Sequence, residues 1–115
     1  MNPLLRVVLS PPKSYNIFAA TYSLKEGGVK MTLEGAIVKE QGVTFAIVIV
    51  KPYILQSNFE SNKAIESFSL YFPNMPIILM AQDYKGRPTY YGRKDIVKFL
   101  TNVPLSCIPW KKFTF

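Results

Sequence analysis

The sequence predicts an α+β domain in which a mixed, largely antiparallel sheet of about 5–7 strands carries two packed helices, with the strand order left open. Three observations predict this class. Short β-branched and aromatic runs alternate with turn residues, two segments have apolar residues at helical spacing, and the length suits one core. The chain has 115 residues, of which 49% are hydrophobic and 18% charged. We therefore expect a single folded domain over residues 1–115.

The first half of the chain is predicted to be all strand. Proline and glycine pairs punctuate it, and Gln41-Gly42 sits where a tight hairpin turn is expected. Residues 43–50 are apolar at successive positions rather than alternating, which predicts a central strand covered on both faces. The strands are expected over residues 4–9, 15–24, 30–39 and 43–51.

The second half combines helices with further strands. Ser57 and Glu60 have the spacing of a capping box, so a helix is predicted over residues 58–71. Its apolar stripe is expected to contain Phe59, Ile65, Phe68 and Phe72. The remaining elements are predicted as strands at 77–82, 88–91 and 105–115 and a second helix at 93–102.

From residue 43 onward, the order of these elements is similar to the second half of a thioredoxin-like fold. Pro76 stands where that family has a cis-proline. The first half is expected to be strands where the family has a strand and a helix, and the family's cysteine pair is missing. The resemblance therefore implies no redox function, and the family is not assigned.

The composition excludes several classes of function. The chain has no histidine and one cysteine, Cys107. Histidine-dependent nucleophiles, histidine metal ligands, Cys-rich zinc sites and a C-x-x-C pair are therefore excluded. No apolar run approaches the length of a membrane-spanning helix, and no signal peptide is recognisable. We expect a non-enzymatic, cytoplasmic protein without metal or cofactor.

Positive charge is concentrated near the carboxyl end. The net charge is +7, and residues 85–115 contain seven Lys and Arg against Asp95 alone. Basic and aromatic residues alternate through residues 84–94, a pattern that can hold phosphates and stack on bases. The candidate residues are Tyr84, Lys85, Arg87, Tyr90, Tyr91, Arg93, Lys94 and Lys98. They predict a binding or accessory protein for an anionic partner such as nucleic acid.

Other interpretations stay open. The lysines can be ordinary solvated charges and the tyrosines can pack on the sheet. The chain can instead be an assembly subunit that self-associates through an aromatic surface, and its tail, with Trp110 and Phe113, would suit either role. A weaker alternative is an enzyme that uses Asp83 or a glutamate. Lys51-Pro52-Tyr53 follows the central strand, at the end where ligand pockets open in α/β sheets.

Overall fold

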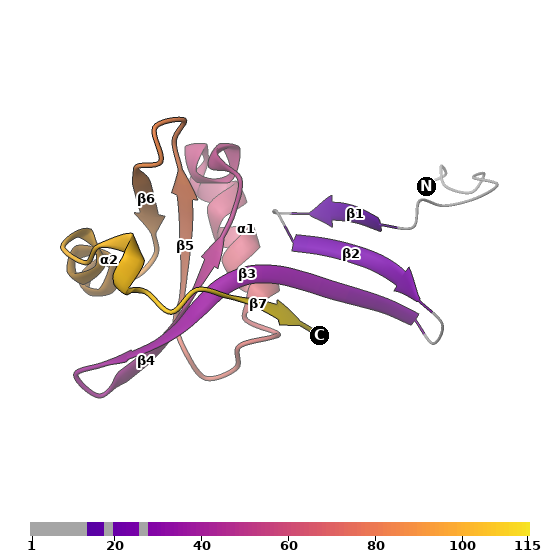
Figure 1. Cartoon of the computed structure of the whole chain (residues 1–115), viewed down its shortest axis with the longest axis horizontal. Coiled ribbons are helices and arrows are strands. Elements are labelled where there is room, and N and C mark those ends of the chain that lie inside the picture. Colours follow the sequence, from indigo (N-terminus) through magenta and orange to yellow (C-terminus); the bar gives the residue numbers. More distant parts are fainter. Residues whose placement is uncertain (1–13, 18–19, 26–27) are drawn as a thin grey trace.

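The computed structural model describes residues 14–17, 20–25 and 28–115, and these form an α+β fold with a mixed sheet and two α-helices (Figure 1). The predicted strand at residues 4–9 lies outside the described residues. The strands are β1 (Ser14–Ile17), β2 (Ala20–Lys25), β3 (Gly28–Glu40), β4 (Val43–Ile49), β5 (Ile77–Gln82), β6 (Pro88–Tyr91) and β7 (Lys111–Thr114). The helices are α1 (Asn58–Phe68) and α2 (Lys94–Thr101), with short 3-10 turns η2 (Pro52–Gln56) and η3 (Leu105–Cys107).

The long strand β3 organises the sheet. Thr32 is paired with strand β2 and also with β7, and Gly35 is paired with β4 and also with β7. A strand has two sides, so β2 and β4 lie one after the other along the same side of β3, with β7 on the opposite side (Figure 1). Strands β4 and β5 are parallel, and the other described pairs are antiparallel.

The predicted hairpin between β3 and β4 is confirmed. Its two turn residues, Gln41 and Gly42, have φ angles of 52° and 80°. Positive φ at both central positions is the geometry of the tight turns that match the twist of paired strands. The parallel step from β4 to β5 then needs a long crossover connection, which η2 and α1 supply.

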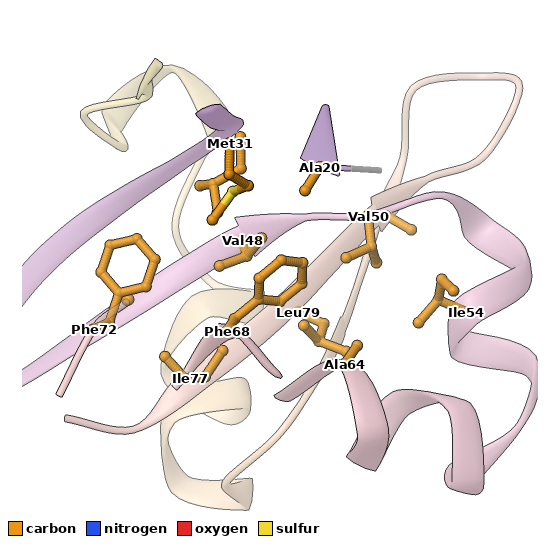
Figure 2. Packing of buried hydrophobic residues seen from close by; sticks show 13 residues of the cluster. Ala20, Met31, Val48, Val50, Ile54, Ala64, Phe68, Phe72, Ile77 and Leu79 are labelled. Atoms are coloured by element: carbon orange, nitrogen blue, oxygen red, sulfur yellow. The ribbon is translucent and has the colours of Figure 1, made fainter. Parts of the chain in front are cut away.

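Two cores lie on opposite faces of the sheet, because neighbouring residues of a strand point to opposite sides. The α1-face core joins α1 residues Ala64 and Phe68 to Val48 and Leu79 of the central strands (Figure 2). The α2-face core joins α2 residues to the alternate strand positions, and its buried members are Ala36, Phe45, Ile47, Ile78, Met80, Ile96, Leu100 and Ile108. Strand β4 is thus covered on both faces, as its sequence predicts.

Helix α1 confirms one prediction and corrects another. The Ser57 hydroxyl accepts a hydrogen bond of 3.3 Å from the Glu60 backbone N–H, as expected for the cap. Phe68 is buried, but Phe59 is 69% exposed, so its place in the predicted apolar stripe is wrong. Phe59 lies at the wrong helical angle to share a face with Ala64 and Phe68, and Lys63 lies over its ring instead.

Three further expectations are corrected. Residues 15–24, predicted as one strand, contain two antiparallel strands, β1 and β2. The predicted tail strand at 105–115 is shorter, because Leu105–Cys107 forms η3 and only Lys111–Thr114 pairs with β3. The bond before Pro76 is trans, since the described residues contain no cis peptide. Pro76 therefore lacks the feature behind the thioredoxin-like resemblance.

Candidate functional site

The predicted basic segment is divided by strand β6 into two groups. Tyr84, Lys85 and Arg87 lie at the tip of the β5–β6 hairpin, beyond the carboxyl end of β5. Arg93 and Lys94 lie at the other end of β6, where α2 begins near the amino end of β5. The four residues of β6 separate the groups by about 13 Å. The two groups therefore do not form one compact cluster.

Tyr90 and Tyr91 lie on opposite faces of the sheet. Tyr91 packs against the α1-face core, and its hydroxyl donates a hydrogen bond of 3.0 Å to Asn62 Oδ1. Tyr90 packs against the α2-face core, and its buried hydroxyl has no hydrogen-bond partner within the described chain. Burial raises the pKa of Tyr90. The two rings cannot form one stacking surface with Tyr84.

The hairpin tip presents one ring and one cation to solvent. Tyr84 is 90% exposed, and Lys85 Nζ lies 5.6 Å from the centre of its ring. The turn is held by Asp83, which accepts hydrogen bonds from the Lys85 and Arg87 backbone N–H groups and from Arg87 Nε at 2.8–2.9 Å. These bonds, led by the Arg87 backbone N–H, lower the pKa of Asp83. Arg87 is thus tied to the turn.

Arg93 is also ion-paired. Its Nε and Nη2 each donate a 2.8 Å hydrogen bond to Asp95, which lowers the pKa of that carboxyl to about 2. The two candidate arginines are therefore engaged, whereas the lysines of this region are exposed and form no ion pair with a carboxylate in the described chain. We call Lys85, Lys94, Lys98, Lys111 and Lys112 the C-terminal lysines; Lys85 and Lys111 lie over the rings of Tyr84 and Phe113.

A hollow opens on the α2 face, at the carboxyl ends of the parallel strands β4 and β5. We call it the carboxyl-end pocket. It has a volume of about 350 Å³ and is lined by Ile49, Met80, Gln82, Leu105, Ser106 and Trp110. This volume is at the lower end of the range for small-ligand pockets. A smaller hollow of about 220 Å³ lies across the sheet, beside η2, and Gln82 lines both.

The walls of the carboxyl-end pocket come from distant parts of the sequence. Ile49 and Met80 form its strand side, and the connection from α2 to β7 brings Leu105, Ser106 and Trp110 over them. The half-buried Trp110 ring is fixed, because its Nε1–H donates a 3.0 Å hydrogen bond to the Leu105 carbonyl. Its remaining contacts are therefore made through carbon.

Polar groups lie at the rim of this pocket. The Gln82 side-chain Nε2 donates to the Gly86 carbonyl at 2.9 Å, which joins the pocket to the basic hairpin tip. Ser106 is exposed. Sequence reasoning identified this end of the central strand through Lys51-Pro52-Tyr53 but missed the Leu105–Trp110 wall. A local pattern does not reveal that wall, because it is brought there by the fold.

The sheet register places two more charged residues beside the pocket. Lys112 is paired with Glu34, and the neighbouring Gly35–Val48 pair brings Glu34 level with Ile49. Ile49, Glu34 and Lys112 thus lie in one row on the same face of the sheet, on β4, β3 and β7. Lys112 is two strands from Ile49, a distance of about 10 Å. Lys51 follows Ile49 by two residues in extended backbone, so it points to the same side.

A separate aromatic cluster lies on the α1 face. The ring centre of Phe115 lies 4.9 Å from that of Tyr71 and 5.6 Å from that of Phe72. The ring centres of Phe72 and Phe113 are 5.3 Å apart. Phe113 also lies under Lys111 Nζ at 4.9 Å. Phe115 is 43% exposed, so part of this cluster reaches the surface.

Acidic residues form no metal-binding group among the residues that the structure describes. Asp83, considered above as a catalytic acid, is bonded to its own turn. Glu40 and Asp95 line a hollow of about 160 Å³ near the β3–β4 turn. Asp95 is held by Arg93, and its lowered pKa contrasts with the raised pKa of a general acid.

The fold and site thus define a small α+β protein with exposed lysines in its C-terminal quarter and a pocket at the carboxyl ends of two parallel strands. Comparison with protein-family models, with curated proteins and with solved structures finds no match to this chain. No helix in the described ranges is long and apolar enough to cross a membrane.

Proposed function

We propose that this chain is a non-enzymatic binding protein whose basic, aromatic C-terminal quarter contacts an anionic partner, with single-stranded nucleic acid as the first choice. One observation carries the proposal. The five C-terminal lysines are exposed and have no carboxylate ion pair in the described chain, so their charge is available to an external anion. Lysines of this kind neutralise the phosphates of nucleic acid and release the counterions bound to them.

The aromatic part of the proposal is narrower than the sequence suggested. Tyr84 remains as an exposed stacking ring beside Lys85, whereas Tyr90 and Tyr91 are divided between the two cores. Arg87 and Arg93 hold Asp83 and Asp95, so the contact charges are assigned to lysines. Lys94 and Lys98 on α2, near the amino end of β5, remain candidates for contact with the anionic partner.

A salt titration of binding to single-stranded DNA or RNA tests the proposal. We expect log K to fall linearly with log salt, with a slope of about −0.7 for each phosphate contact. Lys94→Glu/Lys98→Glu should weaken binding, whereas Lys39→Glu/Lys63→Glu, with the same charge change at two exposed sites outside the C-terminal quarter, should weaken it less. Absence of binding at low salt, or equal losses in the two variants, contradicts the proposal.

A second function is favoured by the aromatic cluster on the α1 face. Exposed Phe115 lies against Tyr71, and exposed Leu70 and Val29 (80% and 55%) are further apolar surface of the chain. These residues would suit an assembly subunit that self-associates. Sedimentation analysis at increasing concentration tests it. A dimer lost in Phe115→Ser but kept in Lys94→Glu/Lys98→Glu would support this function, and a monomer throughout would remove it.

A further inference from the structure

We propose that the carboxyl-end pocket holds one base of the bound single strand, against Trp110. The inference rests on the proposed nucleic-acid function and assigns its base-contacting site. The pocket combines an apolar interior of Ile49, Met80 and Leu105 with an amide, Gln82, and a hydroxyl, Ser106. A nucleobase has the matching chemistry, with apolar ring faces and a polar edge that both donates and accepts hydrogen bonds.

The state of each polar group fits this occupant. The Trp110 indole N–H donates its hydrogen bond to the Leu105 carbonyl. The ring therefore offers carbon surface for stacking and has no donor that needs a partner. Gln82 uses Nε2 toward Gly86, and its carbonyl oxygen has no hydrogen bond within the described chain. The amide oxygen can therefore accept a hydrogen bond from the edge of a base.

Charge complementarity distinguishes a nucleotide from an uncharged ring. Lys51 follows Ile49 on the pocket face of the sheet, and Lys112 lies on the same face in the row of Ile49, with Glu34 between Ile49 and Lys112. Lys85 lies on the hairpin that Gln82 contacts through Gly86. On the pocket face, Lys51 can thus contact a phosphate that flanks a bound base, whereas Lys112 lies opposite Glu34.

Trp110 provides a direct readout, because it is the one tryptophan of the chain. The probes are an oligothymidylate of about ten nucleotides and an abasic strand of the same length and charge. We expect oligothymidylate to change Trp110 emission in a saturable way and to bind about 5- to 150-fold more tightly than the abasic strand. The abasic strand should leave the emission unchanged.

The outcomes separate the two proposals. If both strands bind with equal, salt-dependent affinity and leave Trp110 emission unchanged, the pocket carries no base, and the proposed function stands without it. If neither strand binds at low salt, the proposed function fails and this inference fails with it. If free thymidine monophosphate binds the pocket and the strand does not, the site belongs to free nucleotides and the inference is overturned.

A blocking variant gives a second test. Ser106 is exposed, so Ser106→Phe should fold normally while its ring fills the pocket. It should reduce the affinity for oligothymidylate to that for the abasic strand, with unchanged abasic binding. Ser69→Phe, at an exposed serine that caps α1, is the matched control and should bind oligothymidylate as the unmodified chain does. A folded Ser106→Phe variant with undiminished binding overturns the inference.

Discussion

The two faces of the sheet differ in the hydrogen bonding of their buried hydroxyl groups and in the size of the hollow beside the central strands. On the α1 face, the buried Ser61 hydroxyl donates to the Ile54 carbonyl at 2.8 Å, and Phe72 packs against the tail ring Phe113. On the α2 face, the Tyr90 hydroxyl is buried without a partner in the described chain, and the carboxyl-end pocket stays open beside Trp110. The buried hydroxyl is thus satisfied on the α1 face and without a partner on the α2 face, and the α1 face has the smaller hollow, about 220 Å³ against about 350 Å³.

The largest expected effect is the loss of packing in the α1-face core. Phe68 is 1% exposed, so Phe68→Ala should lower the free energy of unfolding by about 3–5 kcal/mol. Phe59→Ala on the same helix should change it by less than about 0.5 kcal/mol, because Phe59 is exposed. Chemical denaturation measures both values. Similar losses in the two variants would contradict the assignment of the buried side of α1.

Gly35, which is paired on both sides of β3, should be the next most sensitive position. A Cβ there would overlap the Ile47 carbonyl oxygen, so Gly35→Ala should cost about 1–3 kcal/mol or more. Gly42→Ala has nothing within 4 Å of the added carbon, and its cost should be the strain of positive φ, about 1 kcal/mol. A Gly35→Ala variant as stable as the unmodified chain would show that the β4 backbone at Ile47 does not lie against Gly35.

The neighbouring tyrosines should respond with opposite signs. Tyr90→Phe removes a buried hydroxyl without a partner and should raise the free energy of unfolding, by up to about 1 kcal/mol. Tyr91→Phe loses the bond to Asn62 and should lower it by at most about 1 kcal/mol. Thermal unfolding of both variants compares them. A clear loss in Tyr90→Phe would mean that the hydroxyl has a partner.

Tyr90 should also give a pH dependence. Its pKa in the folded chain is raised by burial above the ordinary value of 10.0, so the folded state holds the proton more tightly than the unfolded state. Its contribution to stability is therefore present below pH 10 and declines as the pH rises toward the folded pKa. Tyr90→Phe should remove this part of the alkaline decline.

The smallest effect is expected at Asp95. Its pKa of about 2 in the folded chain lies below the ordinary value of 3.8, mainly because of the hydrogen bond from Arg93. The stabilisation is present above the ordinary pKa and is lost as the pH falls through about 2. Asp95→Asn should abolish this acid dependence. Titration by NMR measures the pKa, and an ordinary value would show that the ion pair does not form in solution.

The sequence predicted the fold class where local patterns agree with the tertiary environment. The continuous apolar run in β4 is buried on both faces, and the Ser57 cap begins α1. The prediction for Phe59 failed for a local reason, because its helical angle places it on the side of α1 opposite to Phe68. The division of Tyr90 and Tyr91 between faces follows from strand alternation once β6 is known to be paired with β5.

The site was less predictable than the fold, because long-range geometry decides which of its residues meet. Basic residues that are adjacent in sequence are divided by β6, whereas Lys112 and Ile49 are brought into one row of the sheet. Trp110 reaches Met80 only through the connection from α2 to β7. The side-chain types were visible in the sequence, and their grouping was not.

The most direct test of the division between the two faces is a map of amide chemical-shift changes during titration with a single-stranded oligonucleotide. We expect the largest changes at Gln82, Ser106, Trp110 and Lys112, around the carboxyl-end pocket. Changes centred on Leu70, Tyr71 and Phe115, with the pocket amides unmoved, would contradict the account and identify the α1 face as the binding surface.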